Sequence, residues 1–445
     1  MDSVTTSGIE SGGTEPAPVL QRAPGPRHVR AGFIPLVDAS VLIVAAELGF
    51  ARREGIELDL VKDVSWSNIR DRLTFRQFDV AHMLSPMPVA AALGIGSNPH
   101  PLIAPMSLGL GGNAITLSVA LYRQMQRSAG LSGTESAMEN AFALRKVVEE
   151  RRANGEPMLT FAMTYPFSSH NYEFRYWMGA AGIHPDQDVR MVVVPPPLTA
   201  DALAAGAIDG FCVGAPWNML GVEAGVGRIV ATKADLWAAS PEKVIGMRPE
   251  WAEANLETVH RLIVALDAAA RWCDTPGNRD ALAEILARPA YIGAPLSILK
   301  RLLTGEFMVD PSGVSRSVPD YFVFHHGAAN FPWRSQALWI YSQMVRWGQV
   351  RFDERFVDLS ASAFRPDIYR EALAGTDTAM PVADSRIEGA SDGPLVVPSL
   401  GGSALTVGAD RFCDGRVFRP DAIEAYIDGF EISTPLRHSF EDGTV

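Results

Sequence analysis

Small polar side chains cluster at five places in the sequence where an apolar run gives way to a helical pattern. These segments are 35–38, 65–68, 85–87, 165–170 and 214–218, and most of their hydrogen-bonding side chains are uncharged. In parallel α/β sheets, ligands lie beyond the carboxyl ends of the strands. The free N–H groups and the dipole of a helix N-terminus favour a negative charge there. The pattern therefore indicates a site for a small anion.

Two α/β units must position these segments. In the first unit, apolar periodicity predicts strands at 28–36, 56–62 and 79–84 and helices at 39–53, 66–76 and 86–93. In the second, it predicts strands at 158–163, 189–194 and 210–213 and helices at 169–181 and 199–205. This alternation favours parallel-rich sheets flanked by helices. Asp79 precedes Pro86, and Asp209 precedes Pro216, by the same seven residues. That spacing is either a repeated unit or a coincidence.

These units give a predicted division of the chain. We expect a disordered N-terminal tail at 1–27, a first segment of lobe 1 at 28–120, lobe 2 at 121–225, a return to lobe 1 with further helices at 226–375, and a C-terminal linker and docking extension at 376–445. The return contains two amphipathic helices, at 251–273 and 336–347. The extension begins in a stretch rich in Gly, Ser, Pro and Asp, which is typical of a linker.

Composition excludes several classes of protein. The 445 residues are 47% apolar and 20% charged, which suits a large globular core. A net charge of −12 without a basic patch argues against direct nucleic-acid binding. Prolines and glycines interrupt the long uncharged stretch 80–122, so we expect no membrane helix. Three separated cysteines and a first segment without an apolar core favour a cytoplasmic protein without an export signal.

A series of motifs carries a specific resemblance. In chain order they are RAGFIPLVDASVLIVAAELGF, SWSNIRDRL, DVAHMLSPMP, GGNAITLS, HNYEFRYW, VGAPWN, PEKVIG and FPWRSQALWIYSQMVRWGQ. Together they resemble the nitrate-binding protein family over most of 28–430. The resemblance implies the type II periplasmic-binding-protein fold, in which two α/β lobes close over a ligand. Members of this family serve nitrate and bicarbonate transporters.

The resemblance also implies which residues line the anion pocket. Carried over residue by residue, they are Trp66, Asn113, His170, Gly214 and Lys243. Nitrate has acceptors only, so this set would supply an indole N–H, an amide, an imidazole, a backbone N–H and one cation. Each residue also has an ordinary interpretation. These are a core aromatic for Trp66, a turn residue for Asn113, a helix cap for His170 and a surface lysine for Lys243.

Other candidate residues receive structural interpretations. Asp38 follows an apolar strand and precedes a helix, which favours an N-cap. His325 and His326 are neighbours without a third ligand nearby, so we expect no metal. We expect no cofactor and no enzyme activity. Pyrimidine-precursor synthases, which resemble these receptors, depend on a cysteine-rich segment that is lacking here. A donor-rich pocket favours nitrate or nitrite over bicarbonate, whose O–H needs an acceptor, but it does not separate nitrate from nitrite.

The expected lack of an export signal separates two functions. It favours a cytoplasmic nitrate and nitrite sensor, which resembles the NasS type. Such a sensor sequesters an RNA-binding antiterminator of NasT type and releases it when the anion binds. The alternative is the substrate-binding subunit of an ABC transporter for nitrate or bicarbonate. One departure concerns the VGAPWN motif, in which Ala215 stands where many transport relatives have glutamate.

Overall fold

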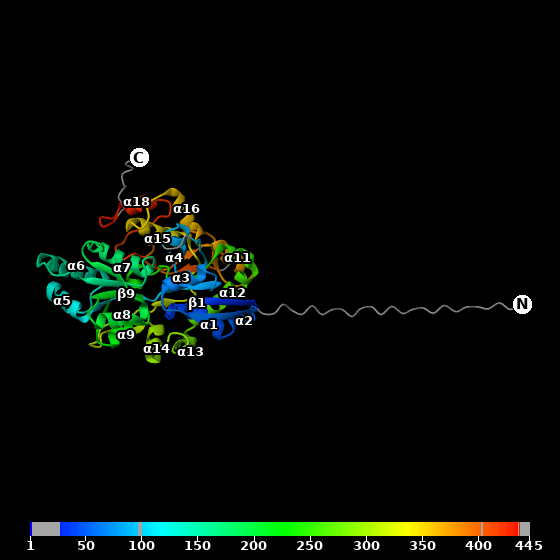
Figure 1. Ribbon diagram of the computed structural model, residues 1–445, viewed down its shortest axis with the longest axis horizontal. Coiled ribbons are helices and arrows are strands. Elements are labelled where there is room, and N and C mark those ends of the chain that lie inside the picture. The colour runs from blue at the N-terminus through cyan, green and yellow to red at the C-terminus, as the bar shows by residue number, and fades with distance from the viewer. Residues whose placement is uncertain (2–26, 97–99, 402–403, 435, 437–445) are drawn as a thin grey trace.

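Two lobes form the body of the protein, and each is built on its own sheet. The structure, a computed structural model, describes Met1 and residues 27–96, 100–401, 404–434 and 436. Two five-stranded sheets with flanking helices lie side by side (Figure 1). This confirms the expected two-lobed α/β architecture. The predicted N-terminal tail lies almost wholly outside the described residues, and Arg27 already belongs to the first strand.

The first lobe has the strand order β2-β1-β3-β11-β4. These strands are β1 (Arg27–Phe33), β2 (Ile56–Lys62), β3 (Val80–Leu84), β4 (Ile103–Ser107) and β11 (Lys243–Met247). β1 runs parallel to β2 and β3, whereas β11 is antiparallel to both of its neighbours. Its early helices are α1 (Ser40–Glu47), α2 (Phe50–Arg53), α3 (Trp66–Thr74) and α4 (Pro86–Ala92). Gly49, with φ of 72°, separates α1 from α2, so the single predicted helix at 39–53 is interrupted by a left-handed residue.

The second lobe has the strand order β10-β6-β9-β7-β8. These strands are β6 (Asn113–Ser118), β7 (Thr160–Met163), β8 (Arg190–Val193), β9 (Gly210–Gly214) and β10 (Gly227–Thr232). β7 pairs in parallel with β8 and β9, and β6 is antiparallel to β9 and β10. Its helices are α5 (Val119–Ala129), α6 (Ala137–Ala153), α7 (Ser169–Ala180), α8 (Thr199–Ala204) and α9 (Trp217–Glu223).

Two connections join the lobes. The first runs through 108–112 and includes the short strand β5 (Leu110–Gly111), which pairs with β14 (Phe322–Val323). The second runs through 233–242 and includes α10 (Lys233–Trp237). The second sheet therefore takes 113–118 and 227–232, both of which the predicted division at 120 and 225 assigned to lobe 1. Sequence periodicity locates a strand but does not say which sheet it joins.

The repeated Asp–Pro spacing reflects a repeated structure. The Asp79 carboxylate accepts a hydrogen bond of 2.9 Å from the Arg30 N–H. The Asp209 carboxylate accepts one of 2.8 Å from the Thr160 N–H. Arg30 lies in the middle of β1, whereas Thr160 begins β7. In each lobe the bond lies at the start of the parallel pairing with the strand that follows the aspartate, so the equal spacing corresponds to the same contact in both lobes.

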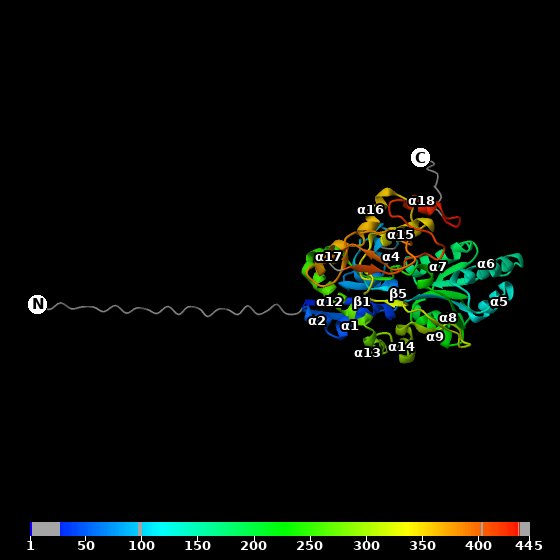
Figure 2. The same ribbon diagram turned by 180° about the vertical axis from the view of Figure 1, so that it is seen from behind.

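The chain after β11 covers the first lobe and then returns to both lobes. Its helices are α11 (Pro249–Ala254), α12 (Leu256–Asp274), α13 (Arg279–Leu286), α14 (Leu296–Thr304), α15 (Arg334–Arg346), α16 (Glu354–Ser362), α17 (Pro366–Leu373) and α18 (Ile423–Asp428). Its remaining strands are β12 (Glu306–Met308), β13 (Ser315–Ser317), β15 (Met380–Pro381), β16 (Leu395–Val397), β17 (Ser399–Leu400) and β18 (Leu405–Val407). α15, α16 and α18 lie together above the two lobes in both views (Figures 1 and 2). Among the described residues, no helix is both long and apolar enough to cross a bilayer.

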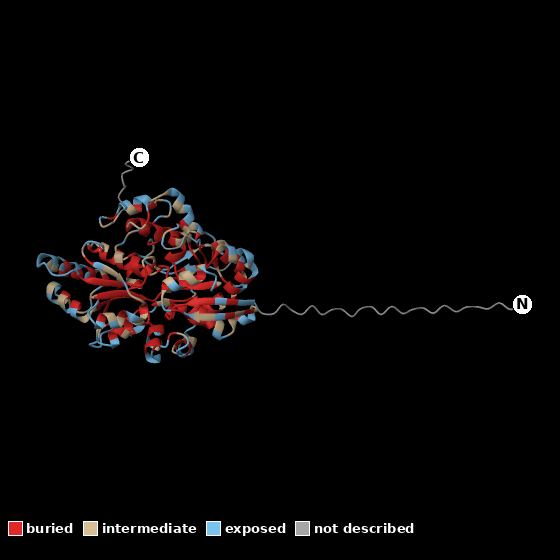
Figure 3. Ribbon diagram, in the orientation of Figure 1, coloured by how far each residue is buried: buried red, intermediate tan, exposed pale blue. Residues whose placement is uncertain are grey.

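The C-terminal extension docks on the body by aromatic packing. Phe412 lies 4.6 Å from Trp237 of α10 and 5.9 Å from Trp339 of α15, measured between ring centroids. Phe412 also stacks on Tyr176 of lobe 2. The extension therefore contacts α10 in the second connection, α15, and α7 of lobe 2. Buried residues concentrate in the sheets of both lobes (Figure 3).

Candidate functional site

A buried cluster of polar side chains lies where the two lobes meet. Lobe 1 and the connections contribute Asp38, Trp66, His82, Lys233, Glu242 and Lys243, and lobe 2 contributes Asn113, Ser169, His170, Glu173 and Gly214. None of the ten residues beyond the glycine is more than 6% exposed. All five residues that the resemblance implied belong to this cluster. Buried groups of this kind require partners or a ligand.

Two helices begin at the site. Trp66 is the first residue of α3, and the Ser65 side chain caps that helix by accepting a 3.1 Å hydrogen bond from the Asn68 N–H. His170 is the second residue of α7, which Ser168 caps in the same way at 3.0 Å from the Asn171 N–H. Each cap is a serine three residues before its partner, as the sequence pattern favours. The helix N-termini therefore present both ring side chains to the junction.

Lys243, the first residue of β11, is the central cation. Its Nζ donates to Asp38 Oδ2 at 2.7 Å and also to Glu242 Oε1. An ammonium carries three hydrogens, so one remains for a ligand. The same Nζ lies 5.5 Å from the centroid of the Trp66 ring. The ordinary interpretation of Lys243 as a surface lysine, which was the alternative to its role in the pocket, is wrong because its side chain is 0% exposed.

Asp38 belongs to the site and is not an N-cap. It lies in a single 3-10 turn, Val37–Ala39, and makes no capping hydrogen bond. Its carboxylate accepts from Lys243 and lies 2.8 Å from His82 Nε2. Burial alone would raise the pKa of Asp38, but Lys243 and His82 outweigh it and the pKa is lowered. Asp38 is thus an ionised partner that holds the lysine in place.

A second ion-pair group adjoins the first. Lys233 Nζ lies 3.0 Å from Glu173 Oε1 and also contacts Glu242 Oε2. Asn113 Nδ2 donates to Glu173 Oε2 at 3.0 Å and to Glu242 Oε2 at 2.5 Å. Both amide hydrogens of Asn113 are thereby used, which differs from its expected role as an anion donor. Burial raises the pKa of Glu173, whereas the two lysines outweigh burial at Glu242 and hold its pKa well below the usual range.

Three buried polar atoms of the cluster have no hydrogen-bond partner among the described residues. They are Trp66 Nε1, Asn113 Oδ1 and His170 Nε2, the last of which lies 3.5 Å from Glu242 Oε1 without making a hydrogen bond to it. An unsatisfied buried group costs about 1–3 kcal/mol, so three in one cluster indicate a place for a ligand. They belong to three of the five residues that the resemblance selected.

His170 is suited to donate to that ligand. Burial lowers the pKa of His170 to about 3, although the negative charge of Glu242 acts to raise it. The imidazole is therefore neutral near pH 7. Thr164 Oγ1 lies 3.1 Å from His170 Nδ1. When the threonine hydroxyl donates to Nδ1, the ring hydrogen is on Nε2, which is the unpartnered nitrogen.

Gly214 leaves room at the centre of the site. It ends β9 opposite Asn113 in the register with β6. A Cβ at this position would lie 3.3 Å from Asp38 Oδ2 and 3.5 Å from Asn113 Oδ1. Any longer side chain would therefore fill the space between the two lobes. The requirement for glycine here is one of space.

Sequence reasoning missed six members of the cluster: Asp38 was assigned to a cap, Ser169 was included only within the segment 165–170, and His82, Glu173, Lys233 and Glu242 were not selected. Two of them left a signal. Glu173 is three residues after His170 on one helix, which places both on one face, and Glu242 precedes Lys243. Lys233 and His82 are identified only by the fold.

The adjacent histidines His325 and His326 are paired with carboxylates. His325 Nε2 lies 3.1 Å from Asp267 Oδ1, and His326 Nδ1 lies 2.8 Å from Asp274 Oδ2. In the part of the chain that the structure describes, no group of three or more His, Cys, Asp and Glu residues is arranged to hold a metal.

Comparison with known proteins gives the same class of molecule. Residues 22–287 match the NMT1-like family. The chain is 31% identical to the nitrate/nitrite binding protein NrtA of Synechococcus elongatus, over 92% of this chain and 87% of that protein. It is 36% identical to the nitrate import ATP-binding protein NrtC of Synechocystis, over 91% of this chain but only 55% of that protein. The chain thus spans about half the length of that import protein.

Solved structures agree on the fold. The periplasmic nitrate-binding protein NrtA from Synechocystis superposes with a TM-score of 0.80 at 26% identity, covering 92% of this chain and 100% of that one. The alkanesulfonate-binding protein SsuA from Xanthomonas axonopodis superposes with a TM-score of 0.53 at 16% identity, over 77% of this chain and 99% of that one.

Fold and site together define a two-lobed binding protein of the periplasmic-binding-protein type, with its polar site buried between the lobes. More particularly, the chain belongs to the NMT1-like family, whose match spans more than half of its length.

Proposed function

We propose that this protein is a receptor that binds nitrate or nitrite between its two lobes. The observation that carries the proposal is the set of unpartnered polar atoms beside Lys243. Trp66 Nε1 and His170 Nε2 make no hydrogen bond among the described residues, although His170 Nε2 lies 3.5 Å from Glu242 Oε1, and Lys243 has one hydrogen left after its two carboxylate bonds. A small anion with acceptors only satisfies all three. The likeness to the two NrtA proteins supports the same ligand.

Bicarbonate is a second candidate because of one observation. Asn113 Oδ1 is a buried acceptor without a donor, and carboxylates of Asp38, Glu173 and Glu242 surround the site. The pocket that was expected to be rich in donors therefore also contains acceptors. Bicarbonate carries an O–H that nitrate lacks, and that O–H would suit such an acceptor.

The simplest biological role is that of a substrate-binding unit of an ABC importer. The likeness to NrtA and to the import protein NrtC supports this role. The regulatory alternative is a cytoplasmic sensor that holds an RNA-binding antiterminator of NasT type until the anion binds. The two roles differ in the partner. A sensor requires that nitrate and the antiterminator weaken each other's binding by the same factor, typically about 1–3 kcal/mol, whereas an importer subunit leaves that antiterminator unbound.

Calorimetric titration with nitrate, nitrite, bicarbonate and chloride tests the proposed ligand. The best small ligands gain about 1.5 kcal/mol per heavy atom, so four atoms correspond to a Kd of roughly tens of micromolar. We expect saturable binding of nitrate or nitrite in this range and no binding of chloride. Binding of bicarbonate alone would select the second candidate. Folded, ligand-free protein that binds none of the four anions would refute the proposal.

Trp66→Phe tests the indole donor within the site. Phenylalanine keeps the aromatic contact with His82, whose ring centroid lies 5.5 Å from that of Trp66, but removes the N–H. We expect the Kd for nitrate to rise roughly tenfold to a hundredfold, since a hydrogen bond to a charged group contributes about 1.5–3 kcal/mol. Titration of the variant measures this change. Trp272→Phe on α12 is the matched control, and an equal Kd in both variants would remove Trp66 from the ligand site.

A further inference from the structure

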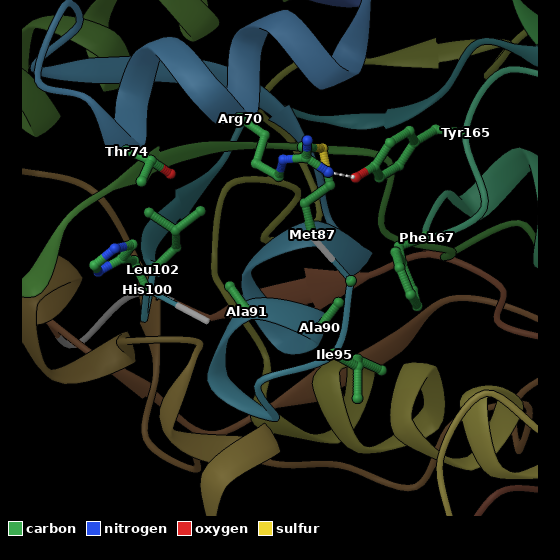
Figure 4. A pocket seen from close by; sticks show the side chains of 11 residues that line it. Arg70, Thr74, Met87, Ala90, Ala91, Ile95, His100, Leu102, Tyr165 and Phe167 are labelled. Atoms are coloured by element: carbon green, nitrogen blue, oxygen red, sulfur yellow. Dashed lines mark hydrogen bonds between the residues drawn. The ribbon is translucent and has the colours of Figure 1, made fainter. Parts of the chain in front are cut away.

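A hydrogen bond between the lobes lies one helical turn outside the anion site. Arg70 is four residues after Trp66 on α3, so both side chains lie on one face of that helix. On lobe 2, Tyr165 follows Thr164, the partner of the His170 ring. Arg70 Nη1 donates a hydrogen bond of 2.7 Å to Tyr165 Oη. Figure 4 shows the guanidinium and the phenol facing each other from opposite sides.

Each partner is held in place on its own lobe. Arg70 Nε donates to Asp71 Oδ1 at 2.7 Å, and only 17% of the Arg70 side chain is exposed. The backbone oxygen of Tyr165 accepts from Ser168 Oγ at 2.6 Å, and Ser168 is also the cap of α7. The bond across the lobes is therefore charge-assisted and preorganised.

The space beside this bond is small. Lobe 1 lines the pocket with Arg70, Met87 and Ile95 among others, and lobe 2 lines it with Tyr165 and Phe167 (Figure 4). Its volume is about 20 Å³, which is room for about one water molecule. The two lobes are therefore closely packed on this side, and they cannot separate here without breaking the bond between Arg70 and Tyr165.

We propose that Arg70 and Tyr165 form a latch that holds the lobes closed over the bound anion and sets the rate of its release. This inference rests on the proposed function. Neither side chain belongs to the buried cluster, so both act as positioning residues. When the lobes open, the bond breaks and leaves the Arg70 charge at the mouth of the cleft. There it raises the association rate of anions.

Stopped-flow measurement of nitrate binding and release tests the latch. Tyr165→Phe removes only the acceptor oxygen, so we expect the dissociation rate to rise roughly tenfold, as loss of one charge-assisted hydrogen bond implies, with an unchanged association rate. Arg70→Gln removes the charge as well. We expect it to raise the dissociation rate and also to lower the association rate and its dependence on salt.

Two control variants make the same chemical changes at positions away from the contact between the lobes. Tyr122→Phe removes a hydrogen bond of 2.9 Å to Glu135 within lobe 2, and Arg145→Gln removes an exposed charge on α6. Both should retain the rates of the natural protein. A Tyr165→Phe dissociation rate equal to that of Tyr122→Phe overturns the latch.

The latch can be tested even if nitrate does not bind, which would refute the proposed function alone. Energy transfer between dyes at Arg53→Cys in lobe 1 and Lys146→Cys in lobe 2, both exposed positions, reports the separation of the lobes. Cys413→Ser removes the one native thiol of the described chain that is not buried. Without any ligand, Tyr165→Phe should shift the distribution to longer distances. A distribution identical to that of the parent overturns the latch independently of the anion.

Discussion

Replacing Lys243 by methionine should abolish nitrate binding and lower the free energy of unfolding by about 3–5 kcal/mol, the cost of removing one partner from a buried ion pair. The Lys243 side chain is 0% exposed, and its ammonium joins Asp38 of lobe 1 to Glu242 of the second connection. Methionine fills a similar volume but leaves Asp38 a buried carboxylate with only His82 beside it. We expect binding to be lost because, in the proposed site, the remaining ammonium hydrogen is the cationic donor to the anion.

Urea unfolding and calorimetric titration separate these two effects. The double variant Lys243→Met/Asp38→Asn removes both charges of the pair, so it should regain much of the lost stability while nitrate binding stays absent. Lys146→Met on the exposed face of α6 is the matched control and should change neither quantity. Nitrate affinity that survives Lys243→Met would refute the assignment of the site. An unchanged free energy of unfolding in Lys243→Met would mean that the ion pair between Lys243 and Asp38 is solvated.

The strands and helices that position the site follow well from periodicity in the sequence. The predicted strand at 56–62 has the observed bounds of β2, and helices were expected at the starts of both α3 and α7. The lobe boundaries did not follow. β6 and β10 are apolar strands like any other, and only pairing between residues about 100 positions apart places them in the second sheet.

Five residues of the buried cluster were expected from the sequence, but their burial and their ion pairs were not. The ring donors Trp66 and His170 near helix starts leave a local signal, and the resemblance added Asn113 and Lys243 to them. Burial leaves no such signal, because whether a lysine is exposed depends on what the other lobe brings against it. Lys243 and Lys233 are therefore recognisable as buried cations only after Asp38, Glu173 and Glu242 have been brought to them.

A separate group of buried charges, Arg386, Glu388 and Asp410, links the C-terminal extension to the second connection between the lobes. This group should make the free energy of unfolding depend on pH. Glu388 accepts from Ser335 Oγ at 2.5 Å and from Arg386 Nε at 3.0 Å, and it is 0% exposed. Beside it, Asp410 accepts from the Trp237 indole of α10. Burial, aided by the charge of Asp410 and opposed by Arg386, raises the pKa of Glu388 to about 7.

This raised pKa fixes the sign of the effect. The folded protein keeps the Glu388 proton to higher pH than the unfolded chain, whose glutamate has a pKa near 4.5. The stabilisation is therefore complete below about pH 4.5 and is lost as pH rises through about 7. One pKa unit corresponds to 1.36 kcal/mol, so we expect this group to reduce the free energy of unfolding by about 3 kcal/mol between pH 4 and pH 8.

Glu388→Gln isolates the contribution of this one group. Glutamine keeps the size and the hydrogen-bonding capacity of the protonated acid but does not ionise, so the variant should gain stability over the natural protein as pH rises. Urea unfolding at intervals from pH 4 to pH 8 measures the difference, and Glu149→Gln on exposed α6 is the control. A difference that does not change with pH would mean that Glu388 is ionised throughout. A difference of the expected sign would show that one proton on Glu388 stabilises the folded protein, in which the neighbouring Asp410 bonds to Trp237 of α10.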